Sequence, residues 1–239
     1  MRTWIVCSAC SQAEPVSGGK FFVELNDNLF FEVVCPKGHE IRITLESTKY
    51  SILFDFGLVA IMDGYYREAV SSIAASLERL YEFFIRVVCT KHDIPFKYVE
   101  KNWAHVAKQS ERQLGAFYFL YLLETGKPAV VLKNELVEFR NKVIHKGTLP
   151  TKEETLNYAE KVHDYMMDLV KYMTNSMDDA TSRTWVDERA RRAKGDPNFS
   201  TISPGPANMV PHVYDPVRHA LTFREKLERL RHCSRWLVT

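Results

Sequence analysis

The sequence lacks any apolar run of 18 residues, so we expect no segment that spans a membrane. It also has almost no net charge, because 32 Lys and Arg residues face 30 Asp and Glu residues, and a balance of +2 points to no particular class of partner. Internal repeats and low-complexity tracts are absent as well. What is present, 46% hydrophobic and 26% charged residues, is typical of a folded protein and excludes wholesale disorder.

Cysteine is scarce, with five residues among 239. The N-terminal segment turns to cysteines and polar residues at Cys7, before the apolar region of a signal peptide could form. We therefore expect a cytoplasmic protein. In a reducing compartment, its cysteines are expected to be metal ligands or small buried side chains rather than disulfides.

The first part of the chain, residues 1–50, has the pattern of a small β unit. Strands are expected at 21–25 and 29–34, with the polar residues between them forming a hairpin turn, and a further half-buried strand at 41–45.

The second part, residues 52–178, carries apolar side chains at the three- and four-residue spacings of amphipathic helices. Helices are expected at 65–91, 96–108, 111–124, 130–146 and 151–177. Thr151 and Glu154 form a capping box that begins the last of them. The predicted fold class is therefore mainly α, a helical bundle preceded by a small β unit.

The third part, residues 179–239, is a basic C-terminal extension. From residue 183 onward it holds 11 Lys and Arg residues against 6 Asp and Glu residues. A proline-rich linker is expected at 194–216, followed by a short helix at 223–233.

Four residues of the β unit have the spacing of a metal site. Cys7 and Cys10 form a CxxC pair, and Cys35 and His39 follow on a second short turn. If the strands bring both turns to one end, three thiolates and an imidazole suit tetrahedral zinc. The pattern resembles a zinc ribbon, so we expect a structural zinc ion that helps this small unit to fold. The alternative is a metal-free β-hairpin with unrelated cysteines.

An arginine interrupts the apolar face of the helix expected at 130–146. At about 100° per residue, Arg140 falls in the middle of an apolar arc, and Asn141 and His145 lie side by side at its edge. The apolar residues of the arc are Leu132, Leu136, Val137, Phe139, Val143 and Ile144. Because a guanidinium keeps its charge, Arg140 needs a carboxylate, a water-filled cleft or an anion, and Glu78 is a candidate partner. A purely structural ion pair is the alternative interpretation.

The segment from Arg140 to His145 matches the R-x4–6-H motif of HEPN domains, which are compact helical bundles found in many RNA-cleaving toxins and antiviral effectors. The segment 66–81 is similar to the long helix that precedes the motif in these domains, and the resemblance covers about residues 55–175. Arg86 and His92 also fit the spacing. We favour the first pair because a polar residue follows Arg140, whereas an apolar valine follows Arg86.

The resemblance implies a metal-independent endoribonuclease, a toxin or antiviral-defence effector that acts on RNA as a homodimer with a composite site. Arg140, Asn141 and His145 would be catalytic, with Glu78 in support and zinc confined to the β unit. His145 would transfer protons, Arg140 would hold the scissile phosphate, and Asn141 would orient the phosphate or the imidazole. The resemblance also allows for an antitoxin or another regulatory partner.

A second interpretation keeps the fold but not the activity. A non-catalytic HEPN module would bind a nucleotide, an RNA or a partner protein as a sensor or adaptor, because a fold does not determine a function.

Overall fold

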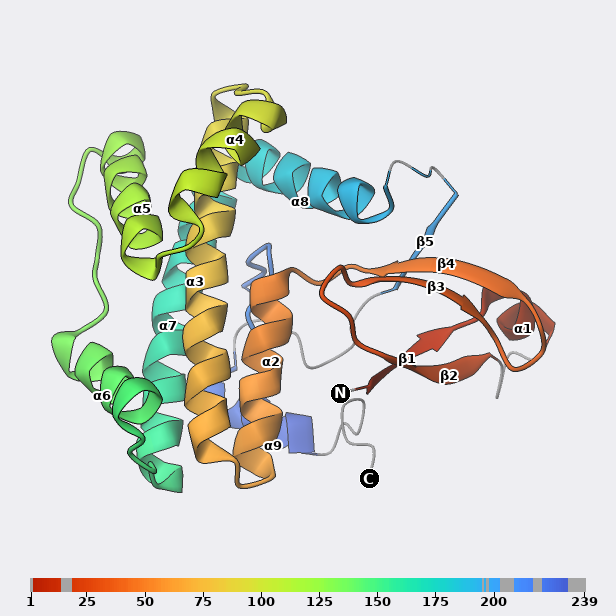
Figure 1. The fold of residues 1–239 in the computed structure, drawn as a ribbon, viewed down its shortest axis with the longest axis horizontal. Coiled ribbons are helices and arrows are strands. Elements are labelled where there is room, and N and C mark those ends of the chain that lie inside the picture. The colour runs from red at the N-terminus through yellow and green to blue at the C-terminus, as the bar shows by residue number, and fades with distance from the viewer. Residues whose placement is uncertain are drawn as a thin grey trace.

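The long helix α3 (Tyr66–Lys91) lies at the centre of a mainly helical chain, with a small β unit to one side (Figure 1). The computed structural model describes residues 2–13, 19–194, 196, 198–202, 209–216 and 221–231. In this part of the chain, every helix is too short or too polar to cross a bilayer. The mainly α fold with an N-terminal β unit is therefore confirmed.

The helices of the bundle pack around α3. They are α2 (Lys49–Met62), α4 (Phe96–Val106), α5 (Ser110–Thr125), α6 (Asn134–Lys146) and α7 (Lys152–Ser176). Their shared core is fully buried at Phe54, Ile73 and Phe84. α2 and α3 pack closely together, since a Cβ atom on Gly57 would come within 2.5 Å of Ile73. Glycine is therefore required at this crossing. The five helices that the periodicity of the sequence predicted correspond to α3 to α7.

Two small sheets form the β unit. β1 (Arg2–Val6) pairs antiparallel with β2 (Lys20–Glu24), and β3 (Phe30–Val34) pairs antiparallel with β4 (Glu40–Leu45). The short helix α1 (Ser8–Ala13) lies between β1 and β2 along the chain.

The hairpin predicted between strands 21–25 and 29–34 is wrong, because β2 and β3 belong to different sheets. Apolar side chains of the two sheets share one buried cluster, which includes Ile5 and Val23 from one sheet and Phe31 and Ile43 from the other. The polar residues after β2 connect one sheet to the other across this cluster. Burial of apolar side chains between the sheets is therefore more favourable than hydrogen-bonded pairing of these two consecutive strands.

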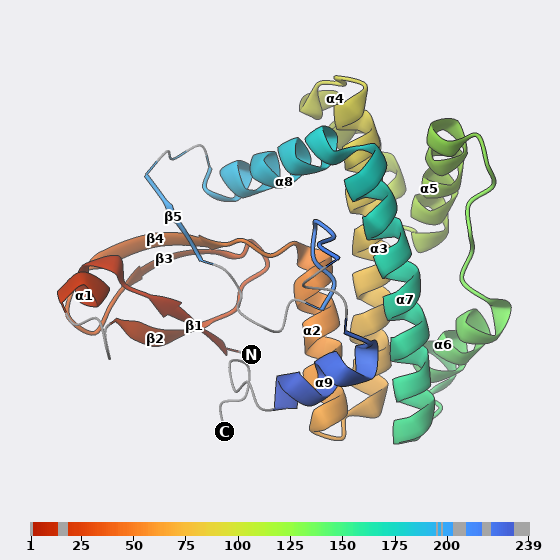
Figure 2. The ribbon, with the colours of Figure 1, turned by 180° about the vertical axis from the view of Figure 1, so that it is seen from behind.

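The C-terminal part ties the bundle to the β unit. It contains α8 (Asp178–Arg192), β5 (Ser200–Ile202) and α9 (Phe223–Arg231). α8 runs from α3 toward β4, β5 extends the second sheet parallel to β4, and α9 packs against α7 (Figure 2). At the joint, the indole N–H of Trp185 donates to the Glu46 carbonyl at 2.7 Å, and Arg192 donates to the Ser47 carbonyl at 2.9 Å.

Candidate functional site

The cysteines and histidine of the β unit converge at one end of the two sheets. One ligand atom from each of Cys7, Cys10, Cys35 and His39 lies within 4.8 Å of all the others. His39 Nδ1 is 3.3 Å from Cys10 Sγ and 3.4 Å from Cys35 Sγ, and the sulfurs of Cys10 and Cys35 are 3.7 Å apart. A tetrahedral zinc ion, at about 2.3 Å from each sulfur, spaces its ligands by about 3.8 Å. The four residues therefore have the donor set and spacing for a metal ion.

Local backbone geometry positions both turns of this cluster. Gly19 packs against the first turn in a left-handed conformation (φ +83°), where a Cβ atom would come within 2.6 Å of the Cys7 carbonyl oxygen. In the second turn, the Cys35 amide donates to the His39 carbonyl at 2.9 Å, and Gly38 adopts a φ of +88°. The two turns thus hold the cluster from both sides.

The thiols of the cluster differ in acidity. Burial, together with hydrogen bonds to Cys7 and Cys35, raises the pKa of Cys10 to about 11. Burial also opposes ionisation of Cys35, but backbone hydrogen bonds at this turn and side-chain hydrogen bonds from Cys10 and His39 together outweigh it and lower the pKa of Cys35 to about 6. The cluster thus favours a thiolate at neutral pH, and a bound cation would displace the remaining protons.

The second group of predicted site residues lies in the bundle, between α3 and α6. Arg140 on α6 donates to Glu78 on α3 at 2.7 Å and to the side-chain oxygen of its neighbour Asn141 at 2.9 Å. Arg140 is 24% exposed and Glu78 30% exposed, so this ion pair is partly shielded from solvent. The apolar arc predicted around Arg140 is only partly buried, because Val143 is fully buried whereas Val137 is 39% exposed.

A cavity of about 460 Å³ opens beside this ion pair. Glu78, Arg140, Asn141 and His145 all line it. The imidazole of His145 is exposed and forms no hydrogen bond with the described residues. The cavity therefore brings together a cation, its carboxylate partner, an amide and a free imidazole.

Three tyrosines complete the wall of this cavity, namely Tyr81, Tyr118 and Tyr158. Burial raises the pKa of Tyr158 well above its usual range, although the charge of Arg140 acts against this shift. The tyrosines could not be predicted from the sequence, because on an amphipathic helix an inward tyrosine that packs in the core has the same spacing as one that lines a cavity.

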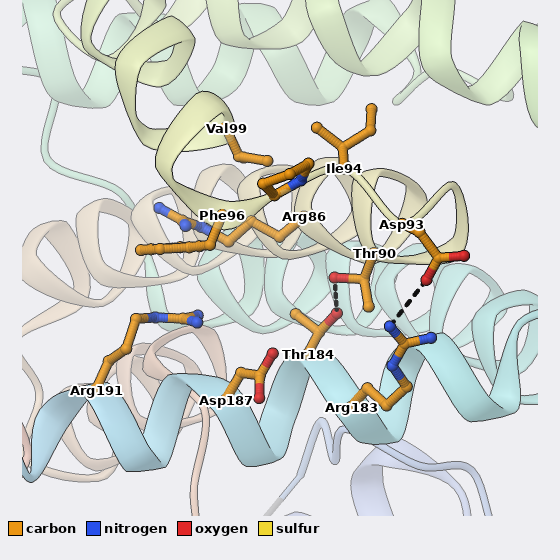
Figure 3. A pocket seen from close by; sticks show the side chains of 11 residues that line it. Arg86, Thr90, Asp93, Ile94, Phe96, Val99, Arg183, Thr184, Asp187 and Arg191 are labelled. Carbon is orange, nitrogen blue, oxygen red and sulfur yellow. Dashed lines mark hydrogen bonds and ion pairs between the residues drawn. The ribbon is translucent and has the colours of Figure 1, made fainter. Parts of the chain in front are cut away.

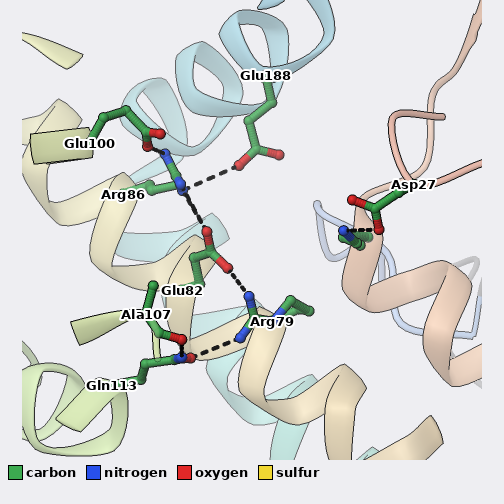
Figure 4. Close-up of polar contacts among 9 residues, drawn as sticks. Asp27, Arg79, Glu82, Arg86, Glu100, Ala107, Gln113 and Glu188 are labelled. Carbon is green, nitrogen blue, oxygen red and sulfur yellow. Dashed lines mark hydrogen bonds and ion pairs between the residues drawn. The ribbon is translucent and has the colours of Figure 1, made fainter. Parts of the chain in front are cut away.

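Gln113 on α5 also lines the cavity and was not anticipated either. Its side chain accepts a hydrogen bond from Arg79 at 2.8 Å and donates to the Ala107 carbonyl at 2.8 Å, as Figure 4 shows. Gln113 therefore links this part of the cavity wall to Arg79 on α3 and to the end of α4.

Arg86 and His92, which also fit the motif spacing, point to different partners. Arg86 pairs with Glu82 at 2.8 Å, whereas His92 contacts Glu124 at 2.5 Å. Each of the two side chains is engaged with a different carboxylate, and His92 lines none of the cavities that Arg86 lines. The geometry favours the Arg140 and His145 pair.

Comparison of the chain with protein-family models, with curated proteins and with solved structures finds no match. The geometry of the two sites, rather than a relative, therefore carries the functional argument.

Proposed function

We propose that this protein is a metal-independent endoribonuclease of the HEPN type. The observation that carries the proposal is the cavity shared by Arg140, Asn141 and His145, in which Glu78 holds the guanidinium. A phosphodiester in this cavity would meet a fixed positive charge next to an imidazole, the side chain most often used as a general acid or base.

The residues suit cleavage by the 2′-hydroxyl of the RNA. His145 takes the proton of the 2′-oxygen, which attacks the phosphorus, while the bond from phosphorus to the 5′-oxygen breaks. A second histidine, His145 of the other copy, donates a proton to the departing 5′-oxygen, and the products are a 2′,3′-cyclic phosphate and a 5′-hydroxyl. A guanidinium has five N–H donors, so Arg140 retains donors for the phosphate beyond those used by Glu78 and Asn141.

An exposed apolar surface supports the dimer that this scheme requires. Large apolar side chains with substantial exposure follow α5, the connection to α6, and α6 itself, at the edge of the molecule away from the β unit (Figure 1). They are Phe119, Leu122, Leu123, Val130, Val131 and Val137. Because Val137 also lines the cavity, a second copy seated here would lie next to Arg140 and His145.

We further propose that the cluster in the β unit holds one zinc ion in a structural role. All four donors come from the protein, which leaves no open position for a substrate. Zinc would therefore stabilise the β unit and take no part in RNA cleavage.

The ion pair of Arg140 with Glu78 favours one alternative, a module that binds RNA or a nucleotide without cleaving it. An arginine that is already paired can be structural, and the same cavity then offers binding without proton transfer.

Cleavage of a mixed RNA pool by the purified protein in excess EDTA tests the proposal. Wild type should cleave, and His145→Ala should lose the activity while its melting curve stays unchanged, because the imidazole is exposed. The matched control is His105→Ala, which removes an exposed histidine of α4 outside the cavity and should leave the rate unchanged. Equal rates for wild type and His145→Ala would rule out the nuclease and favour the binding module.

A further inference from the structure

A second cleft lies where the bundle meets the β unit. It has a volume of about 520 Å³, within the range of small-ligand sites, and is lined by α2, α3, α4, α8 and the turn after β2. None of its lining residues lines the Arg140 cavity, so the two sites are separate.

Charged side chains dominate this cleft. Five are cationic, namely Lys49, Arg79, Arg86, Arg191 and Arg192, and four are acidic, namely Asp27, Glu82, Glu100 and Glu188. Each of the four acidic groups already contacts a cation of the cleft, as Figure 4 shows in large part. The four acidic groups are therefore already paired with cations of the cleft. The five cations exceed them by one positive charge.

The cation left over is Arg191. Within the described part of the chain, its guanidinium makes neither a hydrogen bond nor an ion pair, although its neighbours Arg192 and Arg86 make several. It lies flat against the ring of Phe96, 3.6 Å from the centroid, and Arg86 lies on the other face at 5.5 Å. Figure 3 shows this stack from the side of a smaller cavity of about 210 Å³ that the same three residues line.

Burial acts on both the cations and the acidic groups of the cleft. It lowers the pKa of Arg191, although the nearby carboxylates of Glu188, Asp187 and Glu100 act against this shift. Burial also raises the pKa of Glu188, although the charges of Arg192, Arg86 and Arg191 act against this shift. A partly buried guanidinium that makes no direct ion pair keeps its N–H donors available for an anion.

We infer that this cleft binds a small phosphate-bearing ligand, with Arg191 as the main phosphate contact and Lys49, another cation of the lining, as a second contact. Planar guanidinium groups recognise phosphate through paired N–H donors, and the stack on Phe96 fixes the plane of Arg191 before the ligand arrives. A small ligand fits better than an RNA strand, because the volume of about 520 Å³ is that of a small-ligand site.

Isothermal titration calorimetry with inorganic pyrophosphate at fixed salt tests this inference. Wild type should bind with a Kd below about 1 mM. Arg191→Gln, which keeps much of the side chain over Phe96, should weaken binding at least tenfold. Lys49→Gln should weaken it several-fold, and this second variant keeps the test valid if Arg191→Gln fails to fold.

Two controls define where the anion binds. Arg183→Gln is the matched control, since Arg183 lies on the same helix and is paired with Asp93 and Asp179. It should leave the affinity unchanged. Arg140→Gln should leave it unchanged too, because Arg140 belongs to the proposed nuclease site.

Three results would overturn the inference, and none of them depends on RNA cleavage. They are the absence of pyrophosphate binding to wild type, equal affinities of wild type and Arg191→Gln, and loss of binding in Arg140→Gln alone. Binding of a ten-nucleotide RNA that requires Arg191, without any binding of pyrophosphate, would assign the cleft to RNA instead.

Discussion

At the scale of single residues, the pairing of Arg140 with Glu78 affects the charge that the Arg140 cavity offers to a ligand, together with the carboxylate of Glu111 in the same lining. The two side chains are 2.7 Å apart and a quarter to a third exposed. Solvent therefore screens the pair, and its contribution to the free energy of unfolding is expected to be at most about 1 kcal/mol.

Glu78→Gln should consequently affect RNA binding more than stability. Without the carboxylate charge, Arg140 attracts phosphate more strongly, so we expect the Kd for RNA to fall severalfold at low salt and the melting temperature to change little. Fluorescence anisotropy with a labelled RNA measures this. Glu138→Gln, on the exposed face of α6, is the control for net charge. A weaker complex with Glu78→Gln would contradict the assignment of phosphate binding to Arg140.

His212 gives a separate prediction about pH. Its ring stacks on Trp185 at 4.0 Å, and burial, together with the charge of Arg189, lowers the pKa of His212 to about 4. The unfolded chain binds this proton at a pKa of about 6.5. Between these values the unfolded state binds more protons, so the free energy of unfolding falls as the pH drops.

We expect this one histidine to cost roughly 2 kcal/mol of stability between pH 7 and pH 5. The variant His212→Phe preserves the ring stack. In urea denaturation, its free energy of unfolding should fall between pH 7 and pH 5 by about that amount less than in wild type. The same pH dependence in the variant and in wild type would show that His212 does not titrate as its burial requires.

At the scale of elements, helices were predicted from sequence more successfully than strand partners. The capping box at Thr151 is present, since its hydroxyl accepts from the Glu154 amide and the Glu154 carboxylate accepts from the Thr151 amide. Such signals act within a few residues. Strand pairing in the β unit instead depends on burial between two sheets, which the alternation of apolar residues does not encode.

Helix α8 was not predicted, because its apolar residues show only a weak helical periodicity. Charged residues at both ends complement the helix dipole and could have indicated the helix, namely Asp178 and Asp179 in its first turn and Arg189, Arg191 and Arg192 in its last turn.

For the candidate sites, sequence spacing identified the residues that have a local signature, namely the Cys/His cluster and the Arg140 segment. The tyrosines and Gln113 of the cavity come from other helices and carry no such signature.

The Cys/His cluster of the β unit, as the proposed zinc site, gives a prediction at this scale. Cys35→Ser should bind less zinc, and the β unit should melt at a lower temperature, because metal binding supplies part of its folding free energy. Elemental analysis and a melting curve measure the two effects. Cys89→Ser is the control, since Cys89 lies on α3 outside the cluster. Full zinc content in Cys35→Ser would exclude this residue as a ligand.

At the scale of the whole molecule, the apolar surface along α5 and α6 predicts self-association. Phe119 is 76% exposed and Leu123 69% exposed, which is unfavourable for a monomer in water. Wild type should therefore sediment as a dimer at micromolar concentration, and the double variant Phe119→Glu, Leu123→Glu should sediment as a folded monomer. Val186→Glu on α8 removes an exposed apolar side chain elsewhere and should stay dimeric. A monomeric wild type would remove the basis for a composite site.

The ends of the cleaved RNA test the central claim most directly. If Arg140 and His145 activate the 2′-hydroxyl, RNA cut by wild type in EDTA must carry 2′,3′-cyclic phosphates and 5′-hydroxyls. A substrate with a 2′-deoxyribose at the scissile position must stay intact, and His145→Ala must give none of these ends. Products that end in 3′-hydroxyls, or cyclic phosphates formed equally by His145→Ala, would contradict the account.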